Sequence, residues 1–115
     1  MTKTARILDG RKLAAELREK VRQRAAALRA QSVLPRLDAV IVGSEDNAAR
    51  QYAERQGEEC QALGLEYRLH EIRAGAEFDD IAGRVLLLNE NDRVSGIMMH
   101  LPLPESVDTY RIQKL

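Results

Sequence analysis

The chain has 115 residues, which is enough for one domain with a substantial core but too few for two. Its 18 basic and 18 acidic residues balance, and only 3% of its residues are aromatic, so composition gives no case for binding nucleic acid or an anionic membrane. A single cysteine, Cys60, excludes an internal disulfide or a cysteine metal cluster, and no apolar run approaches the roughly 20 residues of a membrane span. These features predict a soluble, cytoplasmic protein.

The first predicted element is a helix over residues 10–30. Asp9 precedes it, and its carboxylate can accept backbone N–H bonds at the helix start. Apolar side chains recur at helical spacing and form one stripe, which consists of Leu13, Leu17, Val21, Ala25 and Leu28. The run from Ser32 to Pro35 ends this helix.

Strands and helices then alternate to the end of the chain. Residues 44–47 (SEDN) have the composition of a turn and helix cap, and Gly64 is placed to end the helix before it. The predicted elements are strands over 37–42, 66–72 and 94–99, helices over 48–63 and 77–90, and the start of another helix over 105–115. This alternation predicts a three-layer α-β-α domain of the α/β class, with a short parallel sheet and helices on both faces.

Three polar side chains are expected to meet where the strands end. His100 follows the apolar third strand, and Pro102 and Pro104 must end strand pairing there because proline lacks a backbone N–H. Open α/β sheets bind ligands at the carboxyl ends of their strands. Tyr52 and Gln56 are four residues apart on one side of the second helix, near the same edge. Each of these side chains also has a purely structural interpretation, as core or as surface.

The other candidate residues are interpreted as structural. Cys60 is expected to be a small buried side chain, and His70 lies in mid-strand with no acidic partner at catalytic spacing. The two histidines lie on separate strands and make a poor metal site. We therefore expect no metal in this chain. No glycine-rich phosphate-binding motif occurs either, so we expect no bound nucleotide.

Four segments resemble the N-terminal, substrate-binding half of bifunctional methylenetetrahydrofolate dehydrogenase/cyclohydrolase. They are ILDGRKLAAELRE, LDAVIVG, YAERQGEECQALGL and VSGIMMHLPLP. The resemblance implies that residues 1–115 form a catalytic domain that binds a tetrahydrofolate derivative in one-carbon metabolism. It also implies that the family's NADP- or NAD-binding domain is absent from this chain, and that a full-length protein is compatible with a homodimer.

Carried over residue by residue, the resemblance implies roles for five positions. Tyr52 matches the tyrosine that packs on the folate, and Leu101 and Pro102 belong to the L-P-L-P segment of the folate-binding surface. The position of the catalytic lysine holds Gln56, and that of its glutamine partner holds His100. An amide cannot carry a proton as a lysine does, whereas an imidazole can.

Two interpretations of the substituted pair remain open. In the first, Gln56 and His100 exchange the family's two roles and an impaired activity survives. In the second, the site has decayed, and the chain is a catalytically silent relative that binds a small ligand or serves as an interaction domain. The periodic segment that stops at Leu115 leads us to expect a fragment or a truncated coding sequence.

Overall fold

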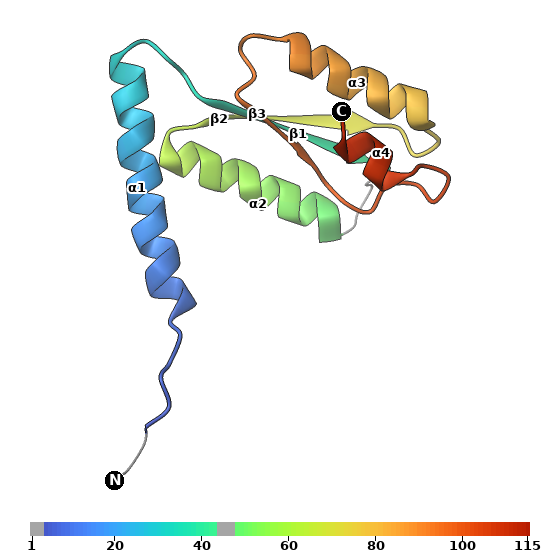
Figure 1. The fold of residues 1–115 in the computed structure, drawn as a ribbon. Coiled ribbons are helices and arrows are strands. Elements are labelled where there is room, and N and C mark those ends of the chain that lie inside the picture. The colour runs from blue at the N-terminus through green and yellow to red at the C-terminus, as the bar shows by residue number, and fades with distance from the viewer. Residues whose placement is uncertain (1–3, 44–47) are drawn as a thin grey trace.

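Three parallel strands form the centre of the domain (Figure 1). The computed structural model describes residues 4–43 and 48–115. β1 (Arg36–Val42) lies between β2 (Glu66–Ile72) and β3 (Gly96–Met99), and both neighbours run parallel to it. The predicted parallel sheet is therefore confirmed, and the strand that comes first in the sequence lies in its middle.

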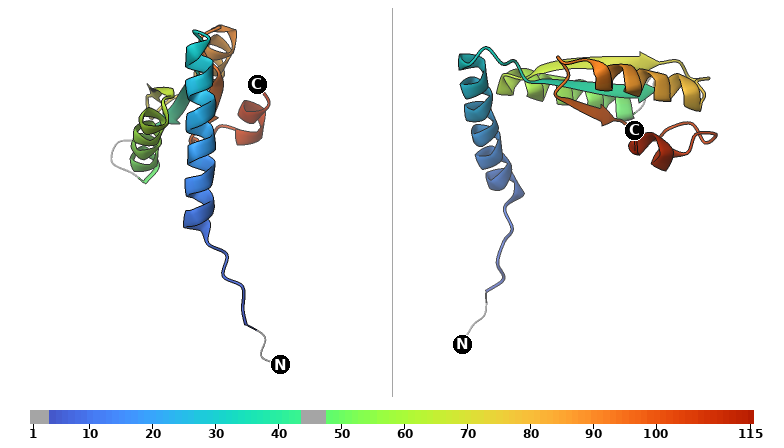
Figure 2. Two further views of the ribbon diagram at one scale, coloured as in Figure 1. Left: turned by 90° about the vertical axis from the view of Figure 1, so that its left-hand side faces the viewer. Right: turned by 45° about the horizontal axis from the view of Figure 1, so that its top comes forward.

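Helices cover both faces of this sheet, as predicted. α2 (Ala48–Leu63) packs on one face, while α3 (Phe78–Glu90) and α4 (Thr109–Gln113) lie on the other (Figure 1). α1 (Gly10–Ala30) belongs to neither layer. It stands at one end of the domain, and its N-terminal half points away from the sheet (Figure 2).

Two elements start at least two residues later than predicted, because local hydrogen bonds precede them. The third strand starts only at Gly96, since the N–H of Val94 donates to the carbonyl oxygen of Asn91 in a turn (3.0 Å). The last helix starts at Thr109 instead of residue 105. Its cap is Asp108, whose carboxylate accepts the N–H of Tyr110 at 3.0 Å.

The core lies mainly between the sheet and α3. The middle of β1 is almost fully buried, with exposed fractions of 0% for Val40 and 2% for Ile41. The larger buried cluster joins the end of β1 to the helices of one face and to the segment between β3 and α4: Val42, Ala76, Ile81, Ala82, Val85, Leu103, Val107 and Ile112. The buried side of α3 carries Ile81, Val85 and Leu88, which recur at helical spacing.

The predicted ends of the first two helices are confirmed. A carboxylate oxygen of Asp9 accepts the N–H of Lys12 at 3.1 Å and caps α1. Gly64 follows α2 with a φ of +82°, a left-handed conformation that glycine adopts without steric cost. The apolar stripe of α1 behaves differently, because Ala25 is the only residue of that helix that is buried.

A buried ion pair with a histidine crosses from β1 to β2. The guanidinium of Arg36 donates two hydrogen bonds to the carboxylate of Asp38, at 2.7 and 2.8 Å, and Asp38 is 0% exposed. His70 Nε2 lies 2.7 Å from the same carboxylate, so His70 has an acidic partner that sequence spacing did not reveal. Burial alone would raise the pKa of Asp38, but the hydrogen bonds from Arg36 and His70 outweigh it and lower that pKa.

No helix within residues 4–43 and 48–115 is both long enough and apolar enough to cross a membrane.

Candidate functional site: a cavity at the carboxyl ends of the strands

His100 lies directly after β3, at the edge where the strands end. The backbone N–H of His100 donates to the carbonyl oxygen of Val40 at 2.9 Å, which continues the sheet pairing by one residue beyond β3. The chain then leaves the sheet through Leu101 and Pro102, and the peptide bond between those two residues is cis. The sequence therefore ends the strand where the prolines require it and leaves an imidazole at its tip.

The imidazole of His100 is buried and incompletely hydrogen bonded. The residue is 6% exposed, and its Nε2 has no hydrogen-bond partner among the residues that the structure describes. A buried polar atom without a partner is costly in a folded protein and often marks a site where a ligand binds. Burial also lowers the pKa of His100, so the ring is neutral at physiological pH and can accept or donate a hydrogen bond at Nε2.

Tyr52 meets His100 from the first half of α2. The two rings are edge to face, with centroids 5.6 Å apart and an interplanar angle of 72°. The tyrosine remains 60% exposed, so much of its surface is open to a bound molecule. Both side chains line a cavity of about 560 Å³ together with Ala48, Ala49, Met98, Met99, Leu101 and Pro102. The volume lies within the range of roughly 300–1,000 Å³ that is usual for small-molecule sites.

Gln56 does not line this cavity, although it lies one helical turn beyond Tyr52. It is partly buried, and its amide oxygen lies 3.4 Å from the hydroxyl oxygen of Tyr67 on β2. The Tyr67 hydroxyl donates a shorter hydrogen bond of 2.8 Å to the carbonyl oxygen of Ala53, and burial raises the pKa of Tyr67 to about 12. The structure thus brings Tyr52 and His100 together, and it places Gln56 against Tyr67.

Gly57 is a residue that sequence reasoning did not single out. A Cβ at this position would lie 2.8 Å from the nearest ring carbon of Tyr67, which is too close for real atoms. The glycine therefore allows the Tyr67 ring to pack directly against the backbone of α2. A glycine in the middle of a helical pattern is a signal of such a close approach, and it was visible in the sequence.

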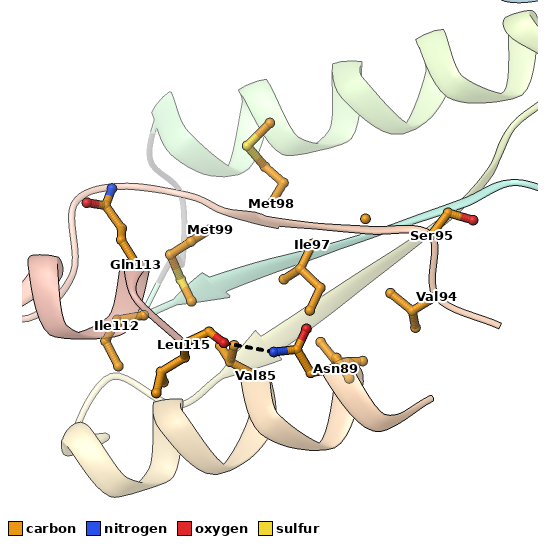
Figure 3. Close-up of a pocket in the computed structure, with 12 residues that line it drawn as sticks. Val85, Asn89, Val94, Ser95, Ile97, Met98, Met99, Ile112, Gln113 and Leu115 are labelled. Atoms are coloured by element: carbon orange, nitrogen blue, oxygen red, sulfur yellow. Dashed lines mark hydrogen bonds between the residues drawn. The ribbon is translucent and has the colours of Figure 1, made fainter. Parts of the chain in front are cut away.

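A second cavity, of about 480 Å³, lies along β3 (Figure 3). Ile97 and Met99 point into it toward α3, whereas Met98 points the other way, toward α2. The amide of Asn89 spans one side and donates to the carbonyl oxygen of Leu115 at 2.9 Å. This cavity has no titratable side chain in its lining, so the cavity at His100 is the better candidate for chemistry.

Part of the expected site cannot be placed. The predicted turn and cap at 44–47, which precedes the helix of Tyr52, lies outside the described residues. Among the residues that are described, no three His, Cys, Asp or Glu side chains are grouped so that they could hold a metal ion. Cys60 is buried, as expected, and burial raises the pKa of its thiol.

The domain is a parallel α/β domain with a cavity beyond the carboxyl ends of its strands, which is where α/β domains typically have their small-molecule sites. The sequence model of the tetrahydrofolate dehydrogenase/cyclohydrolase catalytic domain matches residues 8–115. The chain belongs to this family, and the resemblance seen in the sequence is confirmed.

Individual relatives agree with this assignment. A bifunctional protein FolD of Pelotomaculum thermopropionicum is 38% identical over 108 residues, which are 94% of this chain and 38% of that protein. A methylenetetrahydrofolate dehydrogenase from the silkworm Bombyx mori superposes with a TM-score of 0.86 at 26% identity, over 95% of this chain and 38% of that one. The Trypanosoma brucei dehydrogenase-cyclohydrolase, solved with NADP and an inhibitor, has the same fold here, with a TM-score of 0.84 at 23% identity over 98% and 38% of the two chains. The chain thus spans well under half the length of these relatives.

Proposed function

We propose that this chain is a folate-binding domain that holds a tetrahydrofolate derivative in the cavity lined by Tyr52 and His100. The observation that carries the proposal is the buried Nε2 of His100 at the wall of that cavity, which has no hydrogen-bond partner within residues 4–43 and 48–115. A flat, polar heterocycle such as a pterin suits this wall, because it can lie against the open tyrosine ring and hydrogen bond to the imidazole. Membership of the folate family supports the same ligand, and a cytoplasmic location is part of the proposal.

The chemistry that this site offers is limited to moving one proton. Water attack on a methenyl group requires a base, and a neutral imidazole can accept the proton of the attacking water. Gln56 cannot share this task, since an amide does not take up a proton and its oxygen faces Tyr67. We therefore propose that any hydrolysis of methenyltetrahydrofolate depends on His100 and is weaker than in relatives that have a lysine. Loss of one acid–base group costs about 10²–10⁴-fold.

Hydride transfer is not part of the proposed activity of this chain. NADP and NAD need a phosphate-binding loop, and the residues after β1 read GSEDN, which includes two acidic side chains and lacks the glycine pattern. These residues do not fit a nucleotide pyrophosphate, so no step is assigned to one.

A catalytically silent ligand-binding domain is the second candidate function. The observation that favours it is the hydrogen bond between Gln56 and Tyr67, which keeps Gln56 out of the cavity. The titratable side chains in the lining of the cavity are then those of His100 and Tyr52. Hydrolysis separates the two candidates, whereas binding does not. Both functions predict that tetrahydrofolate binds, but only the first predicts loss of methenyl absorbance beyond the spontaneous rate.

Calorimetric titration of the purified chain with tetrahydrofolate tests the proposal. Stacking of a flat heterocycle on an aromatic ring is worth about 1–3 kcal/mol, so Tyr52→Ala should weaken binding roughly 5- to 150-fold. Tyr110→Ala is the matched control, because Tyr110 is 63% exposed, similar to Tyr52, but lies on α4 outside the cavity. Equal effects of the two substitutions, or no binding by the unaltered chain, would show that the cavity is not a folate site.

A further inference from the structure

Met98 and Met99 are adjacent on β3, but their side chains lie on opposite sides of the sheet. Figure 3 shows Met99 pointing toward α3 and Met98 pointing toward α2. Met99 is partly buried and packs against the core cluster, whereas Met98 is 38% exposed. Met1 lies outside the described residues. The two described methionines thus present the same chemical group in two different environments.

The side chain of Met98 belongs to the cavity at His100. Both residues line this cavity, and they are two positions apart on β3 and its continuation, so their side chains leave the backbone on the same side. The ring of Tyr52 lies against His100 in the same cavity. The thioether of Met98 is therefore part of the surface that the proposed ligand contacts.

Small oxidants reach this thioether by the route that the ligand takes. A cavity that admits a tetrahydrofolate derivative also admits hydrogen peroxide, which is a much smaller molecule. The access of peroxide to Met98 thus follows from the position of Met98 in the binding cavity. It does not depend on what else covers the outer surface of the domain.

Peroxide converts a thioether to a sulfoxide in a two-electron step. The sulfur attacks one peroxide oxygen, a sulfur–oxygen bond forms and the oxygen–oxygen bond breaks. The second oxygen leaves as hydroxide and takes the proton of the first, so the products are a sulfoxide and water. The sulfur is oxidised and the peroxide is reduced. Methionine sulfoxide reductases reverse the change with a dithiol as the electron donor.

Oxidation changes what the wall of the cavity offers to a ligand. A sulfoxide is strongly polar, whereas the lining apart from Tyr52 and His100 consists of apolar side chains. A ligand that covers the sulfoxide oxygen removes this oxygen from water. A polar group that is buried without a hydrogen-bond partner costs free energy, so the ligand binds the oxidised cavity more weakly.

We propose that Met98 is an oxidation site that controls ligand binding in the cavity at His100. The thioether form binds the folate, and the sulfoxide form binds it more weakly until a reductase restores the thioether. The inference rests on the proposed function, because it assigns a form of regulation to the same cavity.

Calorimetric titration with tetrahydrofolate before and after peroxide treatment tests the inference. Catalase must remove the peroxide first, since tetrahydrofolate is itself oxidised by it. Oxidation should weaken binding roughly 5- to 150-fold. Tandem mass spectrometry should place the added oxygen on Met98 before Met99, because Met98 is the more exposed of the two. Treatment with methionine sulfoxide reductases of both stereospecificities should restore the affinity, which separates this change from oxidation of Cys60.

Two leucine variants assign the effect to one sulfur atom. Met98→Leu removes the oxidisable sulfur at nearly constant volume, and Met99→Leu is the matched control on the adjacent residue. The quantity compared is the ratio of affinities with and without peroxide within each variant, so any change in the starting affinity cancels. The ratio should be near one for Met98→Leu, and Met99→Leu should lose affinity as the unaltered chain does. Circular dichroism checks that each treated protein remains folded.

The possible outcomes separate this inference from the proposed function. Failure of the untreated chain to bind tetrahydrofolate refutes the proposed function, and the inference with it. Binding that peroxide leaves unchanged, or that peroxide weakens equally in Met98→Leu, overturns the inference alone. Oxidation of Met99 ahead of Met98 overturns it as well, and this result is obtained without any folate.

Discussion

Gly57→Ala should destabilise this domain, although alanine is the better helix former. The added methyl group would lie 2.8 and 2.9 Å from two ring carbons of Tyr67, and the ring is held by its hydrogen bond to Ala53. Overpacking of this kind costs about 1–3 kcal/mol, against a gain of about 1 kcal/mol in helix propensity. The expected net loss in the free energy of unfolding is therefore about 0–2 kcal/mol.

Gly83→Ala provides the matched comparison. Gly83 is also inside a helix, but a Cβ there meets nothing within 4 Å, so this substitution should stabilise the domain by up to about 1 kcal/mol. Urea unfolding followed by circular dichroism measures both changes, and their difference of about 1–3 kcal/mol isolates the clash. In a Tyr67→Leu background the ring is gone, and Gly57→Ala should then resemble Gly83→Ala. The reasoning is refuted if both glycine substitutions stabilise the intact chain equally.

Two further predictions concern the titratable groups. Methenyl hydrolysis that depends on neutral His100 should rise with pH through a midpoint below the ordinary histidine value of about 6.5, because burial lowers the pKa of His100. His100→Ala should abolish this rise, whereas His70→Gln should keep it. A flat pH profile in the unaltered chain would leave only the silent-domain function. Asp38 has a lowered pKa in the folded state, so its contribution to stability is present above about pH 4 and is lost as the pH falls through the folded pKa. Asp38→Asn should accordingly be less stable than the unaltered chain at pH 7, with a difference that shrinks in acid; a constant difference from pH 7 to pH 2 would contradict the ion-pair assignment.

The sequence predicted the sheet well because its signals are local. Apolar runs bounded by glycine and proline mark β1 and β3, and the cap at Asp9 and the turn at Gly64 each rest on residues adjacent in the chain. The position of His100 at a strand end followed from the two prolines after it. Tyr52 also fell beside His100, as helix and strand geometry implied, because α2 starts at the edge where β3 ends.

What the sequence did not predict depends on contacts between distant residues. Gln56 and Tyr52 share one side of α2, but the helix turns by about 40° over four residues, and a tyrosine on β2 lies within reach of the amide. The pairing of His70 with Asp38 links residues 32 apart in sequence, so no spacing rule could reveal it. The exposure of the α1 stripe was hidden for a related reason: periodicity shows that a helix has an apolar side, but not whether a neighbour covers it.

The central position of β1 has a consequence for synthesis on the ribosome. β1 is the first strand made, yet its partners on both sides come later in the chain, and β3 ends 57 residues after Val42. At a synthesis rate of roughly 5–20 residues per second, about 3–12 s pass between the completion of β1 and that of β3, and β1 has an unpaired edge during this time. During that interval the nascent chain presents a run of four apolar residues, Ala39 to Val42, which is a natural target for chaperones that bind extended apolar segments.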